Sequence, residues 1–315
     1  MNLREMMLAF VENKGAPGHV PAAFFLHFDP AFHRGQAAVD RHMEYFRATG
    51  MDFVKIQYEH PFPRMPQITK PEHWSTIPRF DAEYFSDPLE VVAGIVKAVK
   101  KEAMVVVTLY SAVMHAAHAT SRDLVTEHLQ QDPARTAKGL EIIDEGILLF
   151  VRECVKRGVD GFYVSTQGGE ADRFTDPQLF TRYVKPVDLI VMNECNRLCP
   201  FNILHVCDYQ GLYDDLTPYL DYPGQIVNCG TRLRSRTHTP RELAKMFGRP
   251  FMGGMDRHGI LVSGTRDGIR AEVKKVIRDA PSSFVLGADC TVPSDIPLIN
   301  LKTAIETAHA PAAPR

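Results

Sequence analysis

The chain contains 315 residues, of which 45% are apolar and 23% are charged, and its 36 basic and 38 acidic residues give a formal net charge of −2. A chain of this length can bury a large hydrophobic core without disulfides or metals to hold it together. The near balance of charge excludes the broad basic surface that neutralises nucleic-acid phosphates, and the composition excludes disordered and collagen-like proteins. We therefore expect a globular protein that does not bind nucleic acid.

The amino-terminal stretch carries no export signal. A short apolar patch lies between Glu5 and Glu12, where a signal peptide has an apolar core of about 7–15 residues. The most apolar stretches elsewhere are shorter than the roughly 20 residues that span a bilayer. We therefore expect a cytoplasmic protein without a membrane partner. In that compartment metal or catalytic roles are favoured over disulfides for the six cysteines.

Apolar runs rich in β-branched and aromatic residues predict eight strands. In chain order they cover residues 20–29, 52–60, 103–111, 160–167, 202–209, 225–230, 251–256 and 284–290. Each run is apolar and then turns polar, which is typical of parallel strands buried on both faces.

Amphipathic helices are predicted between the strands. The clearest begins at Asp132-Pro133, an N-cap followed by proline at the first helical position, and ends at Gly158. Another begins at Thr239-Pro240, and the last covers about residues 296–308.

Eight strands alternating with helices predict an α/β fold, a single (β/α)8 TIM barrel over residues 1–315. A doubly wound sheet is the alternative, but no glycine-rich phosphate-binding motif follows the first strand. The proline-rich segment 61–87 is predicted to be a long loop after the second strand, on the side where barrels keep their active sites. It is either a lid or a plain surface excursion.

The ends of two predicted strands carry soft metal ligands. His205 and Cys207 lie at the end of the fifth strand, and Cys290 lies at the end of the eighth. Residues two apart on a strand face the same side, so both side chains of the fifth strand face the barrel mouth. One imidazole and two thiols on one rim predict a zinc site. The alternative is that these side chains are ordinary buried residues, because His-x-Cys by itself is a weak motif.

The fourth metal ligand stays undecided between Cys229, Asn228 and water. Cys229 and Asn228 lie together at the end of the sixth strand, where either side chain can face the mouth. Helix packing explains the other three cysteines, which are Cys154, Cys195 and Cys199.

Polar residues at further strand ends are candidates for positioning a substrate or moving a proton. We select Gln167, Glu170 and Asp256 as catalytic candidates. Weaker candidates of the same kind are Gln57, Glu59, Tyr110, Ser111 and His258. For any single one of them, a hydrogen-bonded rim residue is the simpler interpretation.

These residues make the sequence resemble the uroporphyrinogen decarboxylase superfamily, and within it the zinc-containing, corrinoid-dependent methyltransferases. The resemblance covers most of the chain. It is strongest in HVCD (205–208), FGRPFMGGMDRHGILVSGT (247–265) and LGADCTVPSDIPLINLKTAI (286–305). It implies the same (β/α)8 barrel that the strand pattern predicts.

The resemblance also implies a choice between two activities. The decarboxylase branch uses no metal and holds a tetrapyrrole carboxylate with arginines; where that branch has an arginine segment near the amino terminus, this sequence reads HFDPAFHRG. The methyltransferase branch carries H-x-C after strand five and a cysteine after strand eight, matched here by His205, Cys207 and Cys290. A zinc-dependent methyltransferase is therefore implied, with a metal-independent decarboxylase as the alternative.

The cofactors that the methyltransferase resemblance implies are Zn²⁺ and a corrinoid, carried by a partner protein or free. The other partner is a small thiol, ether or amine that gives or accepts the methyl group, and a homodimer is a further assembly to consider. That branch often has an acidic residue after strand six, where this chain reads Val227-Asn228-Cys229. A catalytically silent small-molecule or corrinoid binder is the alternative from another class of function.

Overall fold

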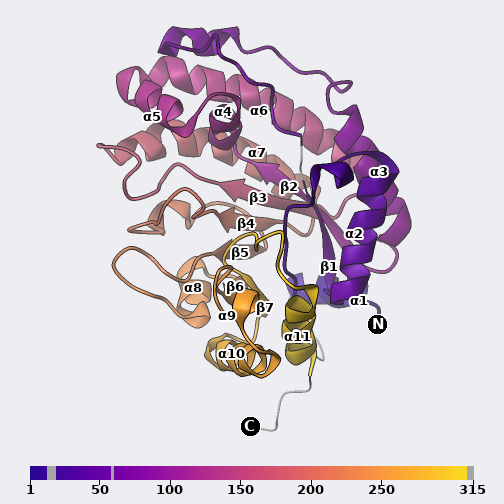
Figure 1. Cartoon of the computed structure of the whole chain (residues 1–315). Helices are drawn as coiled ribbons and strands as arrows, with labels where there is room; N and C mark the ends of the chain where they lie inside the picture. The colour runs from indigo at the N-terminus through magenta and orange to yellow at the C-terminus, as the bar shows by residue number, and fades with distance from the viewer. Residues whose placement is uncertain (13–18, 58–59, 311–315) are drawn as a thin grey trace.

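The computed structural model describes residues 1–12, 19–57 and 60–310. Its strands form one parallel sheet in which each strand pairs with the next along the chain. The strands are β1 (Phe53–Ile56), β2 (Met104–Tyr110), β3 (Gly161–Thr166), β4 (Ile203–Val206), β5 (Ile226–Cys229), β6 (Phe251–Met255) and β7 (Phe284–Ala288). Figure 1 shows the curled sheet with the helices outside it, an arrangement like that of a TIM barrel.

The helices follow the strands as an alternating α/β pattern requires. They are α1 (Leu3–Val11), α2 (Gly35–Thr49), α3 (Ser86–Val99), α4 (Ala112–Ala119), α5 (Arg122–Gln131), α6 (Pro133–Lys156), α7 (Lys185–Leu198), α8 (Pro240–Phe247), α9 (Ile260–Ser263), α10 (Arg266–Asp279) and α11 (Leu298–His309). The predicted start of α6 is confirmed, because the Asp132 carboxylate accepts a hydrogen bond from the Arg135 N–H at 3.1 Å. The predicted start of α8 is confirmed by a capping box between Thr239 and Glu242.

The prediction of a strand over residues 20–29, the first of the eight in chain order, is wrong. This segment makes only isolated parallel bridges, Ala22 with Leu286 and Leu26 with Val292. It still lies between β7 and β1, because the Ala23 N–H donates to Leu286 at 3.0 Å and the Asp52 N–H donates to Ala22 at 3.0 Å. Pro21 has no N–H to give, which helps to explain why no continuous ladder forms.

The segment after β1 is largely irregular, with one 3-10 helix, η2 (Pro71–Thr76). It is fixed to the outer helices by Trp74, which is fully buried and donates from Nε1 to His128 Nδ1 of α5 at 2.9 Å. A Cβ added at Gly139 of α6 would lie 2.5 Å from the Trp74 Cβ, so this glycine is what allows the close approach. The role of a lid stays a prediction. Residues 58 and 59 of the predicted second strand lie outside the described residues, and with them the candidate Glu59.

All strands of the sheet run in the same direction. The loops that precede the strands therefore lie at one edge of the sheet, and the loops that follow them lie at the other. The strands are buried on both faces; in β2 only Tyr110 is partly exposed. The loops that follow the strands meet at the carboxyl edge, where enzymes with this type of fold place their active sites. Across the described ranges, no helix combines the length and the apolarity needed to cross a membrane.

Candidate metal centre

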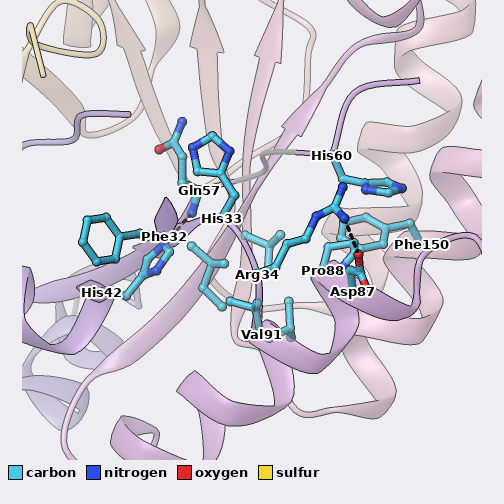
Figure 2. A pocket seen from close by; sticks show the side chains of 13 residues that line it. Phe32, His33, Arg34, His42, Gln57, His60, Asp87, Pro88, Val91 and Phe150 are labelled. Carbon is cyan, nitrogen blue, oxygen red and sulfur yellow. Dashed lines mark hydrogen bonds and ion pairs between the residues drawn. The ribbon is translucent and has the colours of Figure 1, made fainter. Parts of the chain in front are cut away.

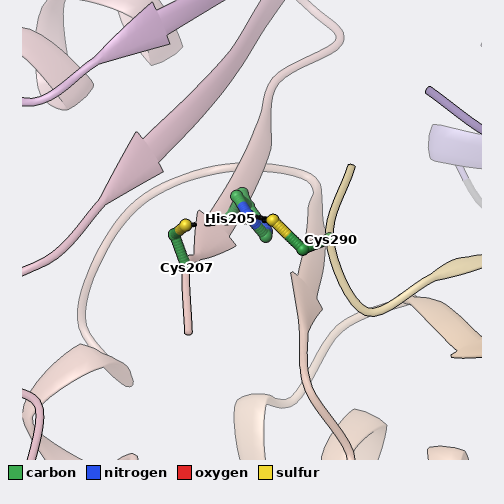
Figure 3. Close-up of side chains that lie close together, drawn as sticks. All are labelled: His205, Cys207 and Cys290. Atoms are coloured by element: carbon green, nitrogen blue, oxygen red, sulfur yellow. Dashed lines mark hydrogen bonds between the residues drawn. The ribbon is translucent and has the colours of Figure 1, made fainter. Parts of the chain in front are cut away.

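His205, Cys207 and Cys290 come together at the carboxyl edge, and we call them the mouth trio. His205 lies in β4, Cys207 directly after it, and Cys290 two residues after β7. All three are buried, with exposed fractions of 2%, 4% and 8%. Their ligand atoms lie within 4.8 Å of one another, and Figure 3 shows the three side chains pointing toward a common point.

The spacing of the mouth trio matches the edges of a tetrahedron. Zinc bonds of about 2.3 Å to sulfur and about 2.0–2.1 Å to nitrogen place two sulfurs about 3.8 Å apart, and a sulfur and a nitrogen about 3.6 Å apart. The Cys207 and Cys290 sulfurs lie 3.9 Å apart, and His205 Nε2 lies 3.4 Å from the Cys290 sulfur. The donor set and its spacing therefore fit a zinc ion.

The two cysteines of the mouth trio share a proton. A hydrogen bond from Cys290 lowers the pKa of the Cys207 thiol well below its usual range, against the opposing effect of burial. The same hydrogen bond, together with burial, raises the pKa of Cys290. Gln167 also donates from Nε2 to the Cys207 sulfur at 3.4 Å. The site thus stabilises the thiolate form of Cys207, and the thiolate is the form of cysteine that binds a metal.

The orientation of His205 is set by Tyr163 of β3. The two rings stack with centroids 5.0 Å apart, and the Tyr163 hydroxyl donates to Asn228 Oδ1 at 2.5 Å. His205 Nδ1 is buried and has no hydrogen-bond partner among the residues that the structure describes, although metal-binding histidines usually donate from their second nitrogen. Stacking therefore holds this ring where a hydrogen bond commonly does so.

Neither protein candidate for a fourth ligand is drawn into the mouth trio. Asn228 is fully buried and all its groups are engaged: besides accepting from Tyr163, its amide donates to the carbonyls of Met252 at 2.9 Å and Ala288 at 3.0 Å. Cys229 lies in the hydrophobic core, where burial raises the pKa of its thiol. A metal held by the mouth trio would therefore take its fourth ligand from water or a substrate rather than from Asn228 or Cys229.

Arg257, in the loop after β6, connects the two loops that carry the cysteines of the mouth trio. Its Nη1 donates to Asp208 at 2.6 Å and to Asp289 at 3.0 Å, and its backbone N–H donates to Asp289 at 2.9 Å. Asp208 directly follows Cys207, and Asp289 directly precedes Cys290. Sequence reasoning missed Arg257, although an aspartate beside each cysteine was a visible signal.

Two of the catalytic candidates have identified structural partners. Glu170 is buried, accepts a hydrogen bond from the Gly168 N–H at 3.0 Å and pairs with the buried Arg173 at 3.5 Å. Asp256 is exposed and accepts from the His258 N–H at 2.8 Å, which closes the turn that carries Arg257. Gln167 is the candidate that contacts the mouth trio. The catalytic role of all three stays a prediction.

Lys55 of β1 is a buried cation inside the sheet that sequence reasoning also missed. Its Nζ donates to Gln57 at 2.8 Å and lies over the rings of Phe25 and Tyr163, 4.8 and 5.0 Å from their centroids. Tyr163 therefore lies between Lys55 and His205. The signal in the sequence was a lysine inside the otherwise apolar strand Phe53–Ile56.

A separate pocket lies at the carboxyl ends of β1 and β2, between the start of α2 and the start of α3 (Figure 2). Gln57 lines it and donates from its backbone N–H to His42 Nε2 at 3.1 Å. His42 Nδ1 lies 2.7 Å from the Ala38 carbonyl, so the ring carries its proton on Nδ1 and is neutral. Arg34 and Asp87 form an ion pair across the pocket at 3.4 Å. Of the described residues that line this pocket, none belongs to the mouth trio.

The remaining cysteines are part of the hydrophobic core, as predicted from helix packing. Burial raises the pKa of the Cys154 and Cys195 thiols and raises that of Cys199 to about 12. Cys207 differs from these three because the pKa of its thiol is lowered by the hydrogen bond from Cys290.

Comparison with known families decides the relationship. The sequence matches the family described as Uroporphyrinogen decarboxylase (URO-D) over residues 45–311. The chain belongs to the uroporphyrinogen decarboxylase family. This membership confirms the resemblance at superfamily level and identifies an enzyme of that superfamily. The comparison with curated proteins finds no match.

Solved structures similar to this family member carry different activities. A methyltransferase from Methanosarcina mazei is 16% identical with a TM-score of 0.77, and the match covers 98% of each chain. An endo-1,4-beta-mannanase from Rhizomucor miehei is 8% identical with a TM-score of 0.56, over 95% of this chain and 96% of that chain. A B12-independent methionine synthase from Shewanella sp. W3-18-1, in complex with selenomethionine, is 12% identical with a TM-score of 0.53, over 93% and 95%. At these identities the likeness shows the fold, while the activity must be argued from the site.

Proposed function

We propose that this protein is a zinc-dependent methyltransferase that moves a methyl group between a small thiol, ether or amine and a corrinoid cofactor. The observation that carries the proposal is the mouth trio, because its tetrahedral spacing and its pair of sulfurs suit zinc. When bound, zinc supplies positive charge that keeps a substrate thiol deprotonated near neutral pH or draws electrons from a methyl ether or amine.

The surrounding residues have separate roles in this proposal. Gln167 donates to the Cys207 sulfur and so moderates the negative charge that the sulfur carries. Tyr163 holds the His205 ring by stacking. Arg257 fixes the spacing of the two cysteine-bearing loops, and Asp256 supports the turn from which Arg257 extends. Glu170 supports the loop after β3, directly beyond Gln167.

The corrinoid in the proposal, carried by a partner protein or free, rests on the family resemblance. The similar structure from Methanosarcina mazei is called a methyltransferase, which agrees with this proposal. The mouth trio lies at the edge of the sheet where a cofactor-bearing partner can approach. No residue of this chain is assigned to corrinoid binding.

A metal-independent decarboxylase receives less support. Such an enzyme needs arginines at the mouth that are available to substrate carboxylates. Arg257, which lies beside the mouth trio, already pairs with two aspartates.

The proposal is tested first by metal content and then by methyl transfer. We expect the mouth trio of the purified protein to hold about one zinc per chain. We also expect transfer from methylcobalamin to a small thiol, or from a methylated thiol, ether or amine to cob(I)alamin, followed by the visible spectrum of the cobalamin. A Cys290→Ala variant should lose the zinc of the mouth trio, about one per chain, and should transfer no methyl group.

The matched control is Cys229→Ala, which removes a buried cysteine of the neighbouring strand end outside the mouth trio. It should keep both zinc and activity. A wild-type protein without bound zinc, or a Cys290→Ala variant that binds zinc as well as wild type, would contradict the zinc assignment. Zinc binding without any methyl transfer would favour the silent binder instead.

A further inference from the structure

A second cluster of metal-binding side chains lies at the opposite, amino-terminal edge of the sheet. Asp52 directly precedes β1, His19 lies in the segment before residues 20–29, and His309 is the last residue of α11. His19 Nε2 lies 2.8 Å from Asp52 Oδ1, and His309 Nε2 lies 2.8 Å from Asp52 Oδ2. The two imidazole rings are 4.1 Å apart between centroids. We call these three residues the chain-end triad.

The chain-end triad has the donor chemistry of a metal site. Asp52 Oδ2 also accepts a hydrogen bond from the Ala22 N–H at 2.7 Å, so both oxygens accept and the group is present as a carboxylate. Two imidazole nitrogens and one carboxylate form a ligand set used by zinc and other divalent first-row metals. The ligand atoms of all three residues lie within 4.8 Å of one another. Binding at Nε2 requires only that each ring carry its proton on Nδ1 instead.

The exposure of the three side chains suits an ion that enters from solvent. The Asp52 side chain is 0% exposed, while those of His19 and His309 are 23% and 28% exposed. The carboxylate therefore lies at the bottom of the cluster and the imidazoles at its open side. Water can complete the coordination sphere there, because the two imidazoles are partly exposed.

The position of the chain-end triad indicates structural rather than catalytic use. It joins three segments that are far apart in the sequence, and the Val20 N–H donates to the Ala308 carbonyl at 3.3 Å beside it. The amino-terminal edge of a barrel-like fold serves stability, whereas the carboxyl edge serves chemistry.

We propose that His19, Asp52 and His309 form a second site for a divalent transition metal such as Zn²⁺, which ties the amino-terminal segment and the end of α11 to the start of β1. This site shares no residue with the mouth trio, so each of the two metal assignments can be tested independently of the other.

The experiment uses the full-length protein with the mouth trio disabled by Cys207→Ser and Cys290→Ser. Zn²⁺ is titrated by calorimetry into metal-free protein, and the melting temperature is measured with and without Zn²⁺. We expect about one Zn²⁺ to bind per chain and the melting temperature to rise with Zn²⁺ concentration, because the ion binds the folded state. Both effects should be lost after His19→Ala and His309→Ala are added.

A His33→Ala variant in the same background is the control, since His33 is a partly buried histidine outside both clusters. It should bind Zn²⁺ as before. Absence of Zn²⁺ binding in the double cysteine variant, or binding that survives the loss of both triad histidines, overturns the proposal and leaves the cluster as a hydrogen-bonded contact.

If the double cysteine variant does not fold, the same comparison is made in the wild-type background. His309→Ala should then lower the bound Zn²⁺ by about one per chain. An unchanged zinc content overturns the proposal in that case as well.

Discussion

The two edges of one sheet hold two clusters that both contain histidine but differ in burial and in ligand type. The mouth trio has one imidazole and two sulfurs, all buried, whereas the chain-end triad has two partly exposed imidazoles around a buried carboxylate. The cysteines of the trio lie in loops after β4 and β7, and Arg257 links these loops. The triad is instead held by hydrogen bonds within the cluster itself.

This difference agrees with the general pattern of barrel-like folds, in which the carboxyl edge serves chemistry and the amino-terminal edge serves stability. Loops after the strands can be rearranged without breaking the sheet, and here they carry the two sulfurs of the mouth trio. Residues before the strands lie beside the chain termini, where a contact mainly affects stability. Four predictions test this contrast, beginning with the largest expected effect.

Loss of a sulfur from the mouth trio should have the largest effect. We expect Cys290→Ser to weaken zinc binding by at least about 100-fold, since even partners outside the first ligand shell account for roughly 10–100-fold. Competition with a chromogenic chelator measures the affinity. An affinity within a factor of ~3 of wild type would show that Cys290 is not a ligand.

Loss of Arg257 should weaken the mouth trio without removing a ligand. We expect Arg257→Met to lower zinc affinity by roughly 10–100-fold, because the loops that carry the two cysteines lose their common partner. Arg79→Met is the matched control, since Arg79 pairs with Glu145 on the surface at 2.6 Å. Equal zinc affinities for the two variants would contradict a positioning role for Arg257.

The pH dependence of the unfolding free energy should reveal the titration of Asp188, a buried acidic residue. Burial raises the pKa of Asp188 to about 7, despite hydrogen bonds from Thr166 and Tyr222 that lower it. The folded state therefore holds this proton up to a higher pH than the unfolded chain, in which Asp titrates near about 3.9. The stability that protonated Asp188 contributes is complete below that value and is lost as the pH rises through about 7.

We expect Asp188→Asn to remove this loss, so that between about pH 5 and pH 8 it loses less unfolding free energy than wild type, by roughly 2–3 kcal/mol. Urea denaturation at both pH values measures it. Asp176→Asn, at an exposed position, serves as the control. Parallel pH profiles for wild type and Asp188→Asn would contradict the assignment.

The smallest effect on the zinc affinity of the mouth trio should come from a substitution in the chain-end triad. The five residues of β7 separate the two edges by about 16 Å, at roughly 3.3 Å per residue. Sites so far apart contribute additively, so His309→Ala should leave the zinc affinity of the mouth trio within about twofold. In metal-free protein it should cost about 0.5–1.5 kcal/mol of unfolding free energy, the value of one hydrogen bond. A larger change in affinity at the mouth would show that the edges are coupled.

Much of the fold followed from periodicity. Seven of the eight predicted strands are present, since buried parallel strands leave a clear apolar run. The predicted ends of β4 and β7 ran too far, because Cys207 and Cys290 lie just beyond the last hydrogen-bonded pairs. Residues 20–29 have the composition of a strand but make only isolated bridges, which depend on partners far away in sequence.

The candidate site was predictable only where residue type and position agreed. His205, Cys207 and Cys290 were found because each follows an apolar run. Arg257 was missed because its role depends on two aspartates from other loops. Lys55 was missed because the rings of Phe25 and Tyr163 that it lies over belong to other segments.

By itself the sequence determined the alternation of strands and helices, the family, and the three mouth residues, because periodicity and local residue types record these directly. Tertiary structure alone decided which side chains meet: the sulfur pair and its tetrahedral spacing, the link through Arg257, and the chain-end triad. These contacts join residues as far as 290 positions apart, from His19 to His309, and a distance between such residues depends on how the whole chain packs.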